Sequence, residues 1–339
     1  MRLLAFLTLV PLFIACGDDD RVRRDTGTGT TDATGGFDAN GRDAPFPDIP
    51  DNREDSCQKM DILFVIDDSG SMSEEQSNLI SNFPLFVEVL DNYRTEAGNP
   101  LDYRLGVTTT GRDITTVISF NVPGVPFPPM TIAETGPNGA LLQPSECSMS
   151  RRWIESADAD VAGTFSCVAN VGTGGSSVEM PLLMTQRALT DRVSDGTNAG
   201  FIRNDALLAV IMLTDENDCS RPEDLVEISL DLAGGAAGAA DACDPNGATI
   251  IPTAQFLSAL DSVKGERGRW AAAVIAGPGP GSCSSSFGDA AEATRLREFV
   301  DTAGDNVVFS SICDGDLAGS LMTALDTFDV ACQNFPPLI

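Results

Sequence analysis

The feature that most constrains the fold is an alternation, beginning near Cys57, of short apolar runs with segments of helical periodicity. The apolar runs are continuous, which is typical of strands buried on both faces. They cover residues 61–66, 103–109, 115–120, 206–213, 270–276 and 307–310. Segments with apolar residues three or four positions apart cover 74–93, 182–193, 256–263, 290–300 and 317–328. This order predicts an α/β fold: a doubly wound, mainly parallel, Rossmann-like six-stranded sheet flanked by helices, with 115–120 at an edge.

Two stretches remain after these elements are assigned, residues 110–176 and 219–250. The first is rich in Pro and Gly, as in NVPGVPFPPM at 121–130, and the second contains GGAAGAADACD at 234–244. Each of them also holds two cysteines. We therefore expect two loop insertions, each closed by a disulfide, within a single domain that spans 57–339.

The N-terminus has the features of an export signal. One Arg precedes an apolar run over residues 3–14, which is too short to span a bilayer. The run ends in Phe-Ile-Ala-Cys16, which resembles a bacterial lipobox, in which the cysteine carries the lipid. We expect a signal peptide over 1–15, lipidated Cys16, and a disordered acidic tether over 16–56, rich in Asp, Gly, Thr and Pro. An ordinary signal with a chance cysteine is the alternative.

The remaining eight cysteines form an even set, which in an exported chain predicts disulfides. A zinc site is the weaker alternative, because there is no Cys-x-x-Cys pair and no histidine, so zinc would need four cysteines. Closure between nearest neighbours predicts Cys147–Cys167, Cys219–Cys243 and Cys283–Cys313. Cys57 and Cys332 would then join the two ends of the domain.

Charge and the missing histidine exclude several functions. The chain has 21 Lys and Arg against 50 Asp and Glu, a formal net charge of −29. Nucleic acid and anionic membrane surfaces would repel it, so we expect no nucleic-acid partner and membrane contact only through the N-terminal lipid. The lack of histidine excludes Ser-His-Asp and Cys-His catalysis and histidine metal ligation. Divalent cations and basic surfaces are suitable partners for so acidic a chain.

Polar residues follow two of the apolar runs at the point where each strand would end. The first run leads into Asp67-x-Ser69-x-Ser71, and the fourth is followed by Thr214 and Asp215. In a doubly wound sheet, ligands bind at the carboxyl ends of the strands where the winding reverses. We expect Asp67 and Asp215 to face each other there, and their oxygen donors suit Mg²⁺, Mn²⁺ or Ca²⁺. The structural alternative is that the first segment is only turn and helix-start chemistry.

Two motifs, DILFVIDDSGSM at 61–72 and VIMLTDENDCS at 210–220, resemble the von Willebrand factor A (vWA) domain. The resemblance covers about residues 57–332 and extends to bacterial envelope lipoproteins that carry this domain. It implies a metal-ion-dependent adhesion site, with Ser69 and Ser71 as direct ligands and with Asp67 and Asp215 bound directly or through water. A loop hydroxyl would complete the set, from either Thr173 or Ser176. Mg²⁺ is the expected ion, with Mn²⁺ or Ca²⁺ possible.

The resemblance also implies that the protein binds a partner and is not an enzyme. Two aspartates and three neutral hydroxyls give the site, with its divalent cation, a total charge near zero. Because the site carries no excess negative charge, the cation can still attract a carboxylate from a protein or glycan ligand. We therefore expect an adhesion module on an exported bacterial lipoprotein, in the outer membrane and periplasm or at the cell surface. One alternative is a structural scaffold of the envelope whose metal site is vestigial or only stabilising. A metal-assisted hydrolase is a further hypothesis, for which only carboxylates could serve as the base.

Overall fold

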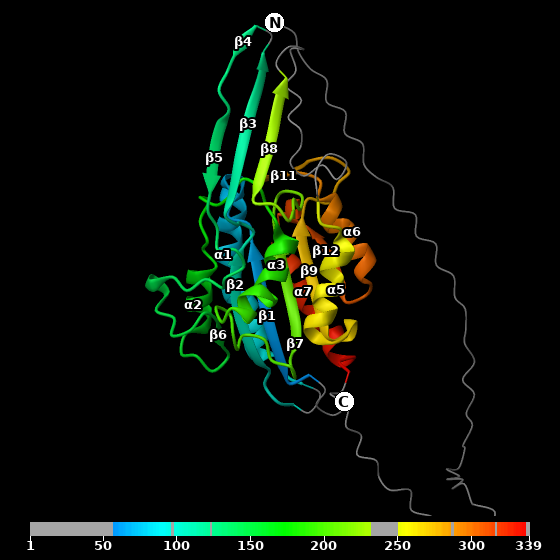
Figure 1. Cartoon of the computed structure of the whole chain (residues 1–339). Helices are drawn as coiled ribbons and strands as arrows, with labels where there is room; N and C mark the ends of the chain where they lie inside the picture. Colours follow the sequence, from blue (N-terminus) through cyan, green and yellow to red (C-terminus); the bar gives the residue numbers. More distant parts are fainter. Residues whose placement is uncertain are drawn as a thin grey trace, which may run out of the picture. The chain divides into compact units, whose positions relative to one another are not determined.

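The computed structural model describes residues 57–95, 98–122, 124–231, 250–285, 288–315 and 317–336. Its main sheet has six strands in the order β12-β9-β7-β1-β2-β6 (Figure 1). Their bounds are β1 Lys59–Ile66, β2 Asp102–Thr109, β6 Ile154–Glu155, β7 Leu207–Leu213, β9 Trp270–Ala276 and β12 Val307–Ser311. Neighbouring strands are parallel except that β6 is antiparallel to β2. The prediction of a mainly parallel six-stranded α/β sheet is therefore confirmed.

The membership of that sheet differs from the prediction at one strand. The segment predicted at 115–120 is a strand, β3 (Ile114–Val122), but it belongs to a second sheet. The sixth place in the main sheet is taken by β6, which has only two residues. A strand this short has no readable periodicity, and an apolar run does not reveal which strand it will pair with.

Helices cover both faces of the main sheet (Figure 1). Alternate residues of β1 enter two different apolar clusters: Ile62 and Phe64 pack on one side, and Leu63 and Val65 on the other. The first side holds α1 (Ser73–Asn92), α2 (Val161–Val168) and α7 (Leu317–Gln333). The second side holds α3 (Pro181–Leu189), α5 (Thr253–Lys264) and α6 (Thr294–Ala303). A short α4 (Asp191–Ser194) and the 3-10 helices Gly70–Met72, Ser145–Cys147, Arg267–Arg269 and Ile312–Asp314 complete the helices described.

The two insertions are not independent loops, because strands from both of them pair in one second sheet. Its members are β3, β4 (Val125–Pro126), β5 (Met130–Glu134) and β8 (Leu225–Asp231). β3 is central: β4 and β5 pair with it antiparallel, and β8 pairs with it parallel. We call these four strands the β-arm, and Figure 1 shows it extending beyond the main sheet. A separate small hairpin consists of β10 (Cys283–Ser285) and β11 (Gly288–Ala290).

Three of the four predicted disulfides are confirmed. Cys57–Cys332, Cys147–Cys167 and Cys283–Cys313 are bonded, with Cα–Cα distances of 5.1, 5.7 and 6.2 Å. The first joins the segment before β1 to α7, so it ties the two ends of the domain together as expected.

Several predictions concern residues outside the described ranges. Cys243, the predicted partner of Cys219, is one of them, and so are the signal peptide over 1–15, lipidated Cys16 and the tether over 16–56. Within the described ranges, no helix is both long enough and apolar enough to cross a membrane.

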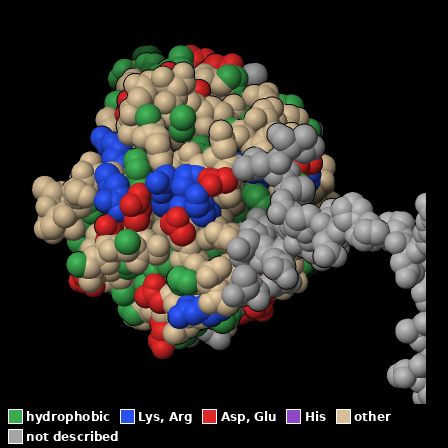
Figure 2. Space-filling view, turned by 90° about the horizontal axis from the view of Figure 1, so that it is seen from below, with side chains coloured by type: hydrophobic (Ala, Val, Ile, Leu, Met, Phe, Trp, Pro, Cys, Tyr) green, Lys and Arg blue, Asp and Glu red, His purple; other side chains and the backbone are tan. Residues whose placement is uncertain are grey.

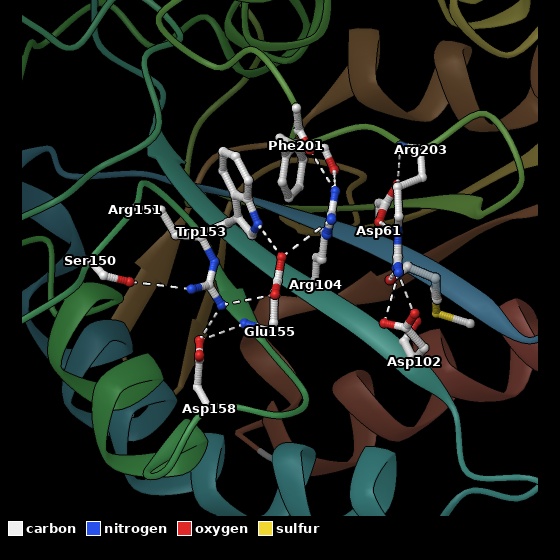
Figure 3. Close-up of polar contacts among 12 residues, drawn as sticks. Asp61, Asp102, Arg104, Ser150, Arg151, Trp153, Glu155, Asp158, Phe201 and Arg203 are labelled. Atoms are coloured by element: carbon white, nitrogen blue, oxygen red, sulfur yellow. Dashed lines mark hydrogen bonds and ion pairs between the residues drawn. The ribbon is translucent and has the colours of Figure 1, made fainter.

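Basic and acidic side chains lie intermixed on the face seen from below in Figure 2. Ion pairs and hydrogen bonds between basic and acidic side chains form a network near the start of β1 (Figure 3). The Arg203 guanidinium lies 2.8 Å from the carboxylate of fully buried Asp61 and 2.7 Å from that of Asp102. Burial raises the pKa of Asp61, and the charge of Arg203 opposes that rise. The buried acid at this end of β1 therefore has its own cation.

We expect Arg203→Met to lower the free energy of unfolding by about 3–5 kcal/mol, because it leaves the Asp61 carboxylate buried without a cation. Replacing both partners, as Asp61→Asn with Arg203→Met, should restore part of that loss. Arg151→Met is the matched control, since its pair with Asp158 is more exposed and such pairs contribute less than about 1 kcal/mol. Urea unfolding followed by tryptophan fluorescence measures all three, and equal losses for Arg203 and Arg151 would contradict the argument.

Candidate functional site

The carboxyl ends of β1 and β7 are neighbours in the main sheet. The strands pair in parallel up to Ile66 opposite Leu213, and the Asp67 amide donates a hydrogen bond of 2.9 Å to the Leu213 carbonyl. Asp67 therefore lies beside Thr214 and Asp215, as the strand order predicted. The chain passes from β1 to β2 on one side of β1, and β7, which follows much later in the chain, pairs on the other side.

Four of the predicted site residues come together at this edge. Asp67 is fully buried, and its two carboxylate oxygens accept hydrogen bonds from the Ser69 amide at 2.8 Å and the Thr214 hydroxyl at 2.5 Å. The Ser69 and Ser71 hydroxyl oxygens are 3.0 Å apart. A hydrogen bond from Ser71 also lowers the pKa of Asp215, although burial and the Asp67 charge outweigh it.

The acids at this edge have buried oxygen atoms without hydrogen-bond partners. One oxygen each of Asp68, Glu75 and Asp215, and both oxygens of Glu179, are buried and unpaired. Glu75 is 2 % exposed and Glu179 is 1 % exposed. Such unsatisfied buried carboxylate oxygens are costly, so they indicate a missing partner.

Burial raises the pKa of each of these acids. It raises the pKa of Asp67 and Asp68 to about 6, and the pKa of Glu75 and Asp215 to about 7. Burial and the nearby charges of Asp67 and Glu216 raise the pKa of Glu179 to about 11. Neighbouring acids add to the rise for Asp67, Glu75, Glu179 and Asp215, and the largest contributions to the five shifts include none from a Lys or Arg of the described ranges.

Buried acids elsewhere in the described chain do have cations. Asp61 at the other end of β1 pairs with Arg203, and fully buried Asp218 lies 3.1 Å from the Arg295 guanidinium. Asp218 follows the predicted metal-binding aspartate by three residues, and this pairing gives it a structural role. The acids at the carboxyl ends of β1 and β7 thus differ from other buried acids in lacking a compensating positive charge.

A hard divalent cation fits this donor set. No three His, Cys, Asp or Glu side chains within the described ranges converge as a ready ligand group. The oxygens that do come together belong to Asp67, Ser69, Ser71 and Asp215, a mixture of carboxylate and hydroxyl donors. Such oxygens suit Mg²⁺, which usually keeps several waters and takes few carboxylates directly. A bound cation would supply the positive charge that the neighbouring acids lack.

The loop at 172–177 lies against the residues that follow β1. The Gly175 amide donates a 2.7 Å hydrogen bond to the Asp68 carbonyl. A Cβ at Gly175 would lie 2.2 Å from the Asp68 carboxyl carbon, so any larger residue there would displace the Asp68 carboxylate. Thr173 is exposed, whereas Ser176 is 1 % exposed and its hydroxyl lies 3.3 Å from a Glu134 carboxylate oxygen. Thr173 and Ser176 both remain candidates for the third hydroxyl.

Sequence reasoning missed Glu75 and Glu179 as members of this site. Glu75 lies in the first turn of α1, where an acid is usual because it interacts favourably with the helix dipole. Glu179 precedes α3 by two residues in a loop with no periodic pattern. The one usable signal was their position next to the predicted ligand segments, and it does not say which way a side chain points.

We expect the metal-free protein to lose stability as the pH rises from about 4 to about 8. The raised pKa values of Asp67, Glu75 and Asp215 mean that the folded state binds more protons than the unfolded state in that window. Their neutral forms stabilise the fold at low pH, and ionisation removes that contribution. Urea unfolding in EDTA across this range measures the decline. Saturating Mg²⁺ should flatten it, and a decline that Mg²⁺ leaves unchanged would contradict cation binding at these acids.

Comparisons with known proteins give only distant structural likeness. No protein-family model matches the chain, and no curated protein matches it. The pilus adhesin SpaC from Lactobacillus rhamnosus GG aligns at 13 % identity and TM-score 0.40, covering 80 % of this chain and 30 % of that one. The manganese-loaded Plasmodium vivax TRAP protein aligns at 10 % identity and TM-score 0.33, covering 80 % and 74 %.

Two further structures match at the same level. The adhesive tip pilin GBS104 of Group B Streptococcus agalactiae aligns at 11 % identity and TM-score 0.38, covering 80 % of this chain and 62 % of that one. Proximal thread matrix protein 1 from the mussel byssus aligns at 10 % identity and TM-score 0.40, covering 80 % and 48 %. The chain therefore spans less than half of that protein and of SpaC.

Proposed function

We propose that the protein is a vWA-type binding module that engages a protein or glycan ligand through a divalent cation, most suitably Mg²⁺. The cation lies at the carboxyl ends of β1 and β7, held by Asp67, Ser69, Ser71 and Asp215. A hydroxyl from Thr173 or Ser176 completes the set. The observation that carries this proposal is the group of buried acids at this edge, which form no ion pair with a Lys or Arg in the part of the chain that the structure describes.

The order of the strands in the main sheet also supports the proposal. The strand order places β1 between β2 and β7, and helices cover both faces of the sheet. We infer from this a doubly wound, Rossmann-like arrangement whose winding reverses between β1 and β7. Ligands bind at such points in open α/β sheets. The vWA assignment rests on the likeness of the two motifs to vWA sequences, and not on the distant structural matches.

We place the protein in the bacterial cell envelope, as an exported lipoprotein attached through Cys16. The disulfides that join described residues support this location, since such bonds persist in oxidising compartments. A lipidated Cys16 and a tether over 16–56 would hold the domain away from the membrane while leaving it free to rotate. We propose recognition rather than catalysis as its chemistry: the chain has no histidine, and the acids at the site would hold the cation.

The cation would supply a coordination position for an acidic group of the partner, and the chain's residues would hold and orient that cation. Asp67 fixes the loop through its bonds to the Ser69 amide and the Thr214 hydroxyl, so the two serines are set before a ligand arrives. A scaffold in which the cation only stabilises the fold remains the second hypothesis. The two differ in whether the bound ion accepts an external carboxylate.

Water relaxation by bound Mn²⁺ separates these hypotheses. We expect the Mn²⁺-loaded protein to lose relaxivity when glutarate is added, because its carboxylate displaces a water from the ion. Glutarate dimethyl ester should have no effect, and Asp67→Ala should fail to load Mn²⁺. If Mn²⁺ binds but its relaxivity does not change when glutarate is added, the result would favour the scaffold hypothesis. If wild-type protein takes up no Mn²⁺, the metal-dependent proposal is wrong altogether.

A further inference from the structure

The β-arm carries most of the exposed bulky apolar side chains. Within the described ranges the exposed large hydrophobic residues are Leu85, Phe127, Met130, Ile132, Leu225 and Val330. Four of these six belong to the β-arm or to its β4–β5 connection. Phe127, Met130 and Ile132 lie along the β4–β5 edge and Leu225 lies on β8 at the other edge, so exposed apolar groups occur at both edges of the β-arm.

One edge of the β-arm is suited to accept another strand. β8 pairs with β3 on one side, and its other edge pairs with no strand of the described ranges. It has seven residues and no proline. The opposite edge is protected, because β4 ends in Pro126 and residues 128 and 129 before β5 are also prolines. Figure 1 shows β8 on the flank of the β-arm, extending past the main sheet.

The side chains of β8 alternate between two environments. Val226 is 2 % exposed and Ile228 is half-buried, and they pair with Thr116 and Ile118 of β3. Leu225, Glu227 and Ser229 are exposed on the other face. A strand added at this edge would continue the alternation, with apolar side chains beside Val226 and Ile228 and polar ones beside Glu227.

The charge on the β-arm selects the kind of strand. The sequence contains no Lys or Arg between residues 113 and 150 or between 222 and 263. Segment 222–231 holds four acids, Glu223, Asp224, Glu227 and Asp231, and the Asp224 carboxylate already contacts Arg112. Acidic edges repel each other, so pairing of two copies through β8 is disfavoured. A basic strand is attracted instead.

We propose that the free edge of β8 binds an extended segment of a partner protein in which apolar residues alternate with Lys or Arg. The backbone hydrogen bonds of strand addition would supply affinity, and the pairing with Glu227 would supply specificity. This site is separate from the cation site and does not require it. The test is therefore run in EDTA, so that its outcome is independent of the metal proposal.

The probe is an acetylated and amidated heptapeptide of alternating Lys and Val. We expect it to slow amide hydrogen exchange in residues 225–231 by about tenfold or more at saturation. The matched peptide of alternating Glu and Val should leave exchange unchanged. Glu227→Lys should weaken binding of the Lys peptide by roughly threefold to tenfold, because a cross-strand attraction becomes a repulsion. Glu227→Gln should have a smaller effect in the same direction.

A Lys-Val peptide with alternate amides N-methylated keeps the charge and the side chains but cannot complete the strand hydrogen bonds. It should not protect β8, and protection as strong as that from the parent peptide would overturn strand addition. Slow exchange along the outer edge of β8 in the free protein would also overturn the proposal. That result would mean that another segment of the chain or a second copy already covers the edge, and sedimentation distinguishes these two.

Discussion

We expect Asp67→Asn to abolish the stabilisation of the fold by Mg²⁺ or Mn²⁺. In wild-type protein we expect the free energy of unfolding to rise by about 2.7 kcal/mol when the cation is at one hundred times its dissociation constant. The variant should show no such rise, because Asp67 provides negative charge at the site and holds the Ser69 amide and the Thr214 hydroxyl in place. Thermal and urea unfolding over a cation series measure both proteins.

The same variant should behave in the opposite way without metal. In EDTA at pH 8, Asp67→Asn should be more stable than wild type by about 2 kcal/mol, since it removes a buried charge whose pKa burial raises to about 6. Asp61→Asn is the matched control, because Asp61 is a buried aspartate of β1, the strand that Asp67 follows, and it pairs with Arg203. It should lose stability in EDTA and keep the full response to Mg²⁺. A variant at Asp67 that is less stable than wild type in EDTA would contradict the unpaired-charge argument.

Removing the Cys57–Cys332 disulfide, as Cys57→Ala with Cys332→Ala, should cost about 5 kcal/mol. The bond closes a loop across 275 residues, so its loss gives the unfolded chain far more freedom than a shorter bond would. Alanine suits both positions, because both cysteines are buried. Urea unfolding of the oxidised proteins measures the loss.

Cys147→Ala with Cys167→Ala is the control, since that bond spans only 20 residues and should cost about 3 kcal/mol. Both double variants should keep their response to Mg²⁺, because neither bond includes a residue of the proposed site. Equal losses from the two bonds would mean that loop length does not set their contribution.

The strands of the main sheet were predictable where burial on both faces produces continuous apolar runs. β7 is an example, since all seven of its residues are buried. β8 was not predicted, because its apolar residues alternate with polar ones in a stretch that we assigned to an insertion. α2 was also not predicted, because it lies within the other stretch that we assigned to an insertion. Local pattern also could not show that strands from both insertions would pair, since pairing depends on contacts across more than a hundred residues.

The candidate site was predictable as far as strand order determines it. Asp67 and Asp215 follow strands that are parallel neighbours, so their proximity follows from the topology. Glu75 and Glu179 reach the same edge through side-chain directions at a helix start and in a loop, which periodicity does not encode. The third hydroxyl stays open between Thr173 and Ser176 for the same reason.

Anomalous diffraction from crystals grown with Mn²⁺ tests the central claim most directly. We predict a manganese peak at the carboxyl ends of β1 and β7, within coordination distance of the Ser69 and Ser71 hydroxyls. Asp67 and Asp215 would bind it directly or through water, and the peak would identify Thr173 or Ser176 as the loop ligand. A well-ordered structure with Mn²⁺ in the buffer and no peak between these residues would contradict the claim.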